Sequence, residues 1–117
     1  MTHPTLSAIC IDCQDASSTA AFWAALLDGE VTHDADGVAA VEAPGATLYF
    51  DEVEGFTSPG WPADTKQFHL DLQGPDPSSF ADRVVELGGS VPDFQPGEER
   101  WTVYLDPAGH PFCISAG

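Results

Sequence analysis

Apolar and polar residues alternate along the first hydrophobic run of the chain, Leu6 to Cys13. Ile9 and Ile11 alternate with less apolar residues, and this two-residue period is typical of a β-strand whose two faces have different surroundings. The pattern therefore predicts a strand with one apolar face. Because Cys10 and Cys13 are three positions apart, a strand places them on opposite faces, and we expect neither a shared metal nor a disulfide.

A helix and three short strands are predicted next. Asp15 is a suitable N-cap and Gly29 a suitable stop for a helix, whose apolar stripe consists of Phe22, Trp23, Leu26 and Leu27. The first half, residues 6–53, thus has the order β-α-β-β-β. Its last three strands are predicted near Glu30–His33, Val38–Glu42 and Thr47–Val53, separated by the turn-forming pairs Asp36-Gly37 and Pro44-Gly45.

The second half, residues 66–115, repeats this order after a linker. The linker, residues 54–65, is rich in Gly, Ser and Pro and carries Phe56 and Trp61. Asp76 and Pro77 are suitable for the cap and first turn of a helix, with apolar positions at Phe80, Val84, Val85 and Leu87 and a stop at Gly88-Gly89. Strands are predicted at Lys66–Leu72, Ser90–Phe94, Trp101–Leu105 and Pro111–Ser115.

The two halves are in register as a sequence repeat. The predicted caps, Asp15 and Asp76, are separated by about half of the chain, and so are the turn glycines before each last strand, Gly45 and Gly109. A repeat of this size indicates two supersecondary units that share one core. With 117 residues, 43% of them hydrophobic, we expect a single α+β domain, residues 1–117, made of two tandem βαβββ modules.

The charge of the chain narrows the choice of partners. Nineteen Asp and Glu residues against three Lys and Arg residues give a formal net charge of −16 at pH 7. A field of this sign repels nucleic-acid phosphates and anionic lipid headgroups, so we expect neither nucleic acid nor a membrane as a partner. No apolar stretch approaches the roughly 20 residues that cross a bilayer, and we expect a cytoplasmic protein.

Several motifs carry a family resemblance when they are taken together with the repeat. Over nearly the whole chain they resemble the glyoxalase / bleomycin-resistance / extradiol-dioxygenase superfamily, also called the vicinal oxygen chelate superfamily. The resemblance implies two βαβββ modules whose mixed sheets curl into a cup for a metal or a small ligand, often within a homodimer. The motifs are ICIDCQD at 9–15, Phe22-Trp23 with Leu26-Leu27, HLDL at 69–72, LGG at 87–89 and DPAGHPFC at 106–113.

The resemblance also implies where a metal would be held. In metal-using members, four ligands, usually His or Glu, come from the first and last strands of each module. The corresponding positions, counted from the helix caps and the turn glycines, are Ala8, Tyr49, His69 and Cys113. Alanine has no ligand atom and tyrosine is a rare ligand, whereas a catalytic site needs about three protein ligands. We therefore expect no metal cofactor, with His69 and Cys113 as the remaining candidates.

The implied cup then has a lining of apolar walls and a few polar groups, which is typical of small-molecule sites. Aromatic rings can stack on a planar ligand, and carboxylates can attract a cation. The aspartates also alternate toward the cup and are the residues that would complete a metal site. The predicted ligand-binding residues are Ala8, Cys10, Asp12, Tyr49, Asp51, His69, Asp71, Trp101 and Cys113.

Two functions are consistent with these residues. The first is a metal-independent protein that sequesters a small aromatic or cationic molecule, as bleomycin-resistance-like members do. The alternative is a metal-dependent enzyme of glyoxalase type, a lyase, isomerase or dioxygenase. A nucleophilic Cys113 paired with His69 is a further alternative, although the sequence identifies no group that orients the histidine. We also expect a homodimer, from the resemblance and because Phe56 and Trp61 offer apolar surface to a partner or a pocket lid.

Overall fold

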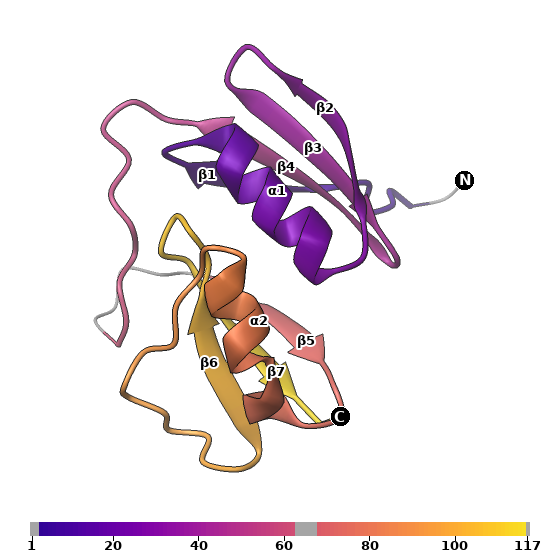
Figure 1. Ribbon diagram of the computed structural model, residues 1–117. Helices are drawn as coiled ribbons and strands as arrows, with labels where there is room; N and C mark the ends of the chain where they lie inside the picture. The colour runs from indigo at the N-terminus through magenta and orange to yellow at the C-terminus, as the bar shows by residue number, and fades with distance from the viewer. Residues whose placement is uncertain (1–2, 63–67, 117) are drawn as a thin grey trace. The chain divides into compact units, whose positions relative to one another are not determined.

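The computed structural model describes residues 3–62 and 68–116, and the chain forms two compact units (Figure 1). Unit 1 comprises Met1–Phe56 and unit 2 comprises Thr57–Gly117. The boundary between them falls inside the predicted linker, 54–65. Each unit contains a small mixed sheet and helical turns, which confirms the predicted α+β class.

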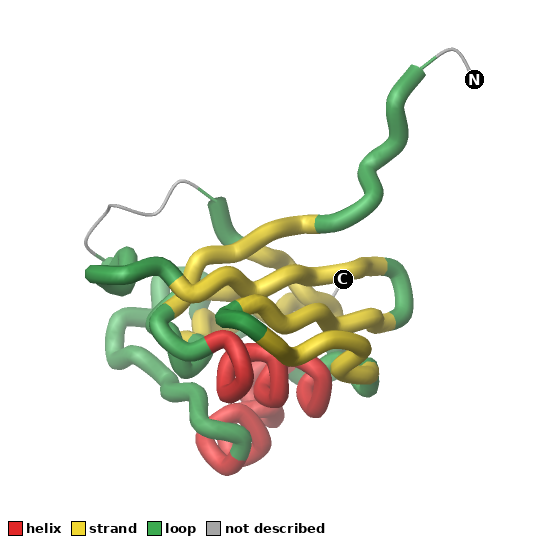
Figure 2. Tube along the Cα trace, turned by 90° about the horizontal axis from the view of Figure 1, so that it is seen from above, coloured by secondary structure: helices red, strands yellow, loops and turns green. Residues whose placement is uncertain are grey.

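Unit 1 has one helix on one face of a four-stranded sheet, sheet A (Figure 1). The strand order is β1-β4-β3-β2, with β1 and β4 parallel and the other neighbours antiparallel. The segment before β1, predicted as strand from Leu6, instead extends away from the sheet as coil (Figure 2). The elements are β1 (Ile9–Cys13), α1 (Ala16–Leu26), β2 (Glu30–Ala35), β3 (Val38–Ala43) and β4 (Ala46–Glu52).

Helix α1 begins at the predicted cap. The Asp15 side chain accepts a hydrogen bond from the Ser18 backbone N–H at 3.0 Å, and Glu52 of β4 accepts one from the Ala16 N–H at 3.0 Å. These two carboxylates satisfy donors that the first helical turn leaves open. On the buried side, Phe22 and Trp23 are edge-to-face, with ring centroids 5.4 Å apart.

The end of α1 differs in detail from the prediction. Asp28, not Gly29, adopts the left-handed conformation that ends the helix, with φ of 55°. Gly29 is required for a different reason, because a Cβ there would lie 2.7 Å from the Glu42 carbonyl oxygen. The glycine therefore allows the chain to approach β3 closely as it leaves the helix.

Unit 2 has a three-stranded sheet, sheet B, with the order β5-β7-β6. Strands β5 and β7 are parallel, and β6 and β7 are antiparallel. Part of the predicted strand Lys66–Leu72, residues 66 and 67, lies outside the described residues. The elements are β5 (Leu70–Gln73), the 3₁₀ helix η1 (Pro77–Phe80), α2 (Ala81–Glu86), β6 (Trp101–Leu105) and β7 (Pro111–Ser115).

The helical segment of unit 2 starts more loosely than α1. Asp76 is at its cap position, but its side chain makes no capping hydrogen bond; its backbone carbonyl accepts from the Ser79 N–H at 2.9 Å. The segment is held instead by Tyr104 of β6, a fully buried residue whose hydroxyl donates to the Pro77 carbonyl. Burial raises the pKa of the Tyr104 phenol.

The strand pairings are equivalent in the two units where the first and last strands of each module meet. Ile9 is paired with Leu48 in sheet A, and Leu70 is paired with Phe112 at the equivalent place in sheet B. In both sheets the first strand of the module lies parallel to the last one. The two modules therefore share this parallel pairing and its register, although sheet B has one strand fewer than sheet A.

The alternation of burial also agrees with the predicted apolar face. The inner residues of the last strands are almost completely buried: Leu48, Phe50, Phe112 and Ile114 are 0–2% exposed. On the first strands the apolar residues Ile9, Ile11, Leu70 and Leu72 are half-buried, whereas their neighbours Cys10, Asp12, Asp71 and Gln73 are exposed.

The predicted strand Ser90–Phe94 was wrong. In the described part of unit 2, Ser90 forms a single bridge with Leu105, and no strand covers residues 91–94. Pro92 has no N–H to donate, which prevents a continuous ladder. The primary amide of Gln95 pairs with the edge strand instead: its Nε2 donates to the Val103 carbonyl at 2.9 Å and its Oε1 accepts from the Val103 N–H at 2.8 Å.

This amide contact generates a stability prediction. Gln95→Ala removes the partner of the N–H and C=O of Val103, a fully buried residue, so we expect a loss of about 1–3 kcal/mol in the free energy of unfolding. Chemical denaturation measures the loss, and Gln73→Ala, at an exposed position of β5, is the matched control. Equal effects of the two substitutions would contradict the role of the Gln95 amide.

Candidate functional site

The face of sheet A that points away from α1 carries polar and aromatic groups, and we call it the open face of sheet A. It includes Cys10 and Asp12 of β1 and Tyr49 and Asp51 of β4. The register places Cys10 beside Tyr49 and Asp12 beside Asp51. The Tyr49 residue is 38% exposed, so its ring is accessible to a ligand.

The pairing of Asp12 with Asp51 brings two like charges to neighbouring positions. Asp12 is exposed and Asp51 is half-buried. Like charges directly opposite one another on neighbouring strands are destabilising, and the short side chain of aspartate gives little freedom to separate them. The open face of sheet A is therefore suited to a cation that neutralises this pair.

The face of sheet B that carries Asp71 and Cys113 also has polar and aromatic residues, and we call it the open face of sheet B, although Val103 beside Cys113 is buried. Asp71 of β5 is paired with Cys113 of β7, and Trp101 of β6 is paired with Ser115. His69, directly before β5, contacts Asp71, with 3.1 Å between His69 Nε2 and Asp71 Oδ1. The side chains of His69 and Asp71 are 42% and 75% exposed.

Three residue types that bind metals meet on this face. His69, Asp71 and Cys113 each offer one ligand atom, and these atoms all lie within 4.8 Å of one another. Asp71 also contacts His69, and it is therefore a group that could orient this histidine, which the sequence alone did not identify. The alternation along β5 predicted that Asp71 lies on this face, but only the register with β7 shows that it is next to Cys113.

Trp101 lies against two residues of the preceding loop. A Cβ on buried Gly97 would be 2.4 Å from the indole ring, so the glycine backbone packs directly on Trp101. The Arg100 guanidinium carbon is 4.8 Å from the centroid of the same ring, within the range of a cation–π interaction. The loop therefore fixes the orientation of the indole.

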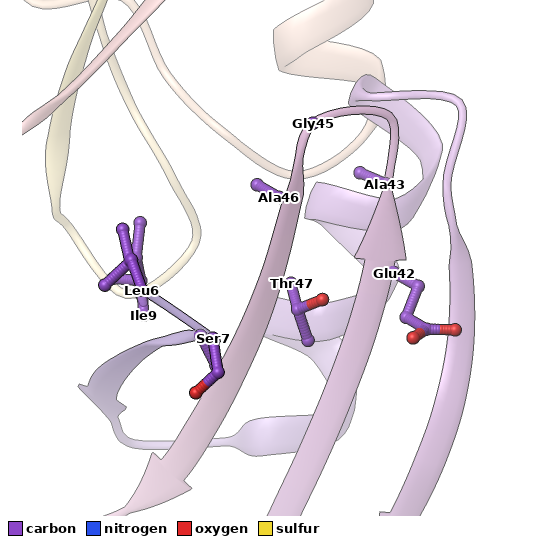
Figure 3. A pocket seen from close by; sticks show the side chains of 9 residues that line it. Leu6, Ser7, Ile9, Glu42, Ala43, Gly45, Ala46 and Thr47 are labelled. Atoms are coloured by element: carbon purple, nitrogen blue, oxygen red, sulfur yellow. The ribbon is translucent and has the colours of Figure 1, made fainter. Parts of the chain in front are cut away.

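A pocket of about 490 Å³ lies in unit 1 between the segment before β1 and the β3–β4 hairpin (Figure 3). Its lining includes Ala8, one of the predicted site residues, together with Glu42 and Thr47, which are paired across the hairpin. Sequence reasoning missed Glu42 and Thr47, although their alternation with buried Val41 and Leu48 was a signal. The full lining is Leu6, Ser7, Ala8, Ile9, Glu42, Ala43, Gly45, Ala46 and Thr47.

The structure thus places the predicted residues in two groups. Unit 1 carries Ala8, Cys10, Asp12, Tyr49 and Asp51, and unit 2 carries His69, Asp71, Trp101 and Cys113. Cys10 and Cys13 of β1 point to opposite faces of the sheet, as predicted: Cys10 is exposed and Cys13 is buried.

The linker aromatic Trp61 has an intramolecular role in unit 2. Its Nε1 donates to the Phe94 carbonyl at 2.9 Å, and the two rings are 6.2 Å apart. Contact with a partner or a ligand would have to use the remaining surface of the indole. The role of Phe56 in a dimer stays a prediction.

Comparison with models of known protein families identifies the family of this chain. A family model described as a glyoxalase-like domain matches residues 8–115. The chain belongs to the glyoxalase-like domain family. No curated protein matches it.

Solved structures show that this glyoxalase-like protein shares the fold of the wider superfamily. The fosfomycin resistance protein FosX from Mesorhizobium loti is 17% identical, with a TM-score of 0.69 over 99% of this chain and 94% of that one. A glyoxalase family protein from Enterococcus faecalis is 18% identical, with a TM-score of 0.68 over 98% and 99%. A FosX variant from Listeria monocytogenes, solved with Mn(II) and 1S,2S-dihydroxypropylphosphonic acid, is 21% identical, with a TM-score of 0.66 over 99% and 92%.

The metal set that the superfamily implies does not fit this chain. Two of the four positions are Ala8, which has only a methyl group and lines the unit 1 pocket, and Tyr49, which lies beside Cys10 on the open face of sheet A. The remaining two positions, His69 and Cys113, are both in unit 2, where Asp71 joins them. Ala8 and Tyr49 therefore do not supply the His or Glu ligands that the resemblance implies for the first module.

The aspartate pair of sheet A generates a second prediction. We expect Asp12→Asn to increase the free energy of unfolding by about 0.2–1 kcal/mol, because it removes the like charge beside Asp51. Salt should reduce this gain, since it screens the repulsion in the parent protein. Denaturation at low and high ionic strength measures both effects, and Asp93→Asn in an exposed loop is the control. A loss of stability in the absence of ligand would contradict the interpretation.

Proposed function

We propose that this glyoxalase-like protein binds a small organic molecule, aromatic or cationic, and sequesters it without a divalent metal, in the manner of bleomycin-resistance-like proteins. One observation carries the proposal: on the open face of sheet A an accessible Tyr49 adjoins the like-charged pair of Asp12 and Asp51. An aromatic ring next to carboxylates is suited to an organic cation.

Charge supports this choice of ligand. The cation–π attraction of a tyrosine ring and the Coulomb attraction of two carboxylates act in the same direction. The formal net charge of −16 further raises the local concentration of cations. Unit 2 also carries an aromatic ring and a carboxylate, Trp101 and Asp71, on one face of sheet B, where strand β7 lies between them.

A second candidate function is a metal-dependent lyase, isomerase or dioxygenase of the glyoxalase type. The gathering of His69, Asp71 and Cys113 favours it, because three ligands with an open position are the minimum for a catalytic metal centre. The loss of ligand atoms at Ala8 argues for the binding protein as the first choice.

The test is a thermal-shift screen against a library of cationic and neutral aromatic molecules. A ligand that binds only the native state raises the unfolding temperature as its concentration exceeds the dissociation constant. We expect hits to be cationic. Tyr49→Ala should weaken binding at sheet A, and Trp101→Ala should weaken binding at sheet B, each about five- to thirtyfold, the equivalent of about 1–2 kcal/mol for a lost cation–π contact.

Two controls make the screen decisive. Tyr49→Phe keeps the ring and should keep most of the affinity, so a loss as large as that of Tyr49→Ala would point to the hydroxyl rather than to stacking. A chelator such as EDTA should leave ligand affinity unchanged. Ligand binding that disappears with EDTA and returns with a divalent ion would favour the metal-dependent enzyme.

We also propose a homodimer in the cytoplasm, with neither nucleic acid nor a membrane as a partner. In the described residues, no helix has the length and apolar character needed to span a membrane.

Light scattering over a range of protein concentrations should give twice the mass of the 117-residue chain. A mass of one chain at all concentrations would exclude the dimer and leave Phe56 without the proposed role at its interface.

A further inference from the structure

The side chains of His69, Asp71 and Cys113 form a compact ligand set in unit 2. The pairing of parallel strands β5 and β7 places Asp71 beside Cys113, and His69 Nε2 is 3.1 Å from Asp71 Oδ1. One ligand atom from each residue lies within 4.8 Å of the others. Nitrogen, oxygen and sulfur donors are therefore directed to one place on the open face of sheet B.

We propose that these three residues bind one Zn²⁺-like cation, that is, a borderline or soft divalent ion, without any ligand from unit 1. The superfamily arrangement draws on both modules, and Asp71 is not one of its four positions. The inference therefore concerns a changed ligand set and a changed cation preference in this chain. It does not depend on the organic ligand proposed above.

The donor types set the preference for the cation. Thiolate and imidazole ligands suit Zn²⁺ and softer ions, whereas Mn²⁺ and Mg²⁺ prefer carboxylate, carbonyl and water oxygens. Replacing a family ligand by Cys113 therefore moves the site away from hard cations. When the metal bonds to Cys113 Sγ, the thiol releases one proton to solvent, so binding should become tighter as the pH rises.

The distances agree with a zinc coordination sphere. Zinc bonds of about 2.0–2.3 Å in a tetrahedral site place the ligand atoms about 3–4 Å apart. The His69–Asp71 distance of 3.1 Å already meets this requirement, and the separation of at most 4.8 Å within the set needs only small side-chain rotations. Since His69 and Asp71 are partly exposed, a fourth position stays open to water.

Stability alone does not account for the contact between His69 and Asp71. Both side chains are exposed to solvent, at 42% and 75%, and an ion pair at such a place contributes little to stability. A metal site gives the arrangement a function, because the same exposure that weakens the ion pair lets an ion enter from solution.

The experiment is a titration of the reduced, full-length protein with Zn²⁺ and Mn²⁺ by calorimetry and with Cd²⁺ by ultraviolet absorption. We expect one equivalent of Zn²⁺, at least tenfold tighter than Mn²⁺, and a sulfur-to-metal charge-transfer band with Cd²⁺. Cys113→Ser should abolish the band, whereas Cys10→Ser, which changes an exposed cysteine of unit 1, should retain it.

A second pair of variants tests the carboxylate. Asp71→Asn should weaken Zn²⁺ binding about tenfold or more, while Asp51→Asn on the open face of sheet A should have no such effect. Because Asp71 is exposed, this pair decides the question even if Cys113→Ser fails to fold. A Cd²⁺ band that survives Cys113→Ser, equal effects of the two asparagine variants, or Mn²⁺ binding as tight as Zn²⁺ would each overturn the proposal.

Discussion

The parallel pairing of the first and last strand of each module is the constraint on which the rest of the structure depends. Strands β1 and β4, and likewise β5 and β7, are joined by long stretches of chain, yet their pairing fixes which side chains are neighbours. A shift by one residue would exchange the buried and open faces. Such a shift would bury the carboxylates and expose the apolar residues of the buried face. Burial of the apolar face therefore fixes the register, and the register determines which side chains are neighbours on the open face.

The open faces illustrate how function and stability compete at a candidate site. The inner residues Leu48 and Phe112 contribute burial, whereas Asp12 beside Asp51 opposes folding through charge repulsion. If the proposed cation binds there, relief of this repulsion adds to the binding free energy.

Much of the fold could be predicted from the chain because its local signals agree with one another. The alternation around Ile9 and Ile11, the Asp15 cap and the repeat gave the α+β class and most elements. The segment 90–94 could not be predicted, because the residue that completes the sheet edge, Gln95, is a polar side chain in a loop and carries no strand signal. For the site, periodicity showed that Asp71 shares a face with Cys113, but their contact with His69 depends on distances that only coordinates provide.

Among the described residues, the outer edge of β6 is covered by the Gln95 amide and by the bridge between Ser90 and Leu105. This arrangement has a consequence for how the protein can vary. The unpaired backbone groups of an exposed edge strand can pair with another strand. In β6, the Gln95 amide bonds to the N–H and the carbonyl of Val103, although Gln95 is not part of a strand. The loop from residue 96 to residue 100 is therefore not bound to any ladder. Insertions there can change the loop that packs on Trp101 while the register of sheet B stays the same. Unit 2 thus separates a loop whose length can vary from the strands whose register the fold requires.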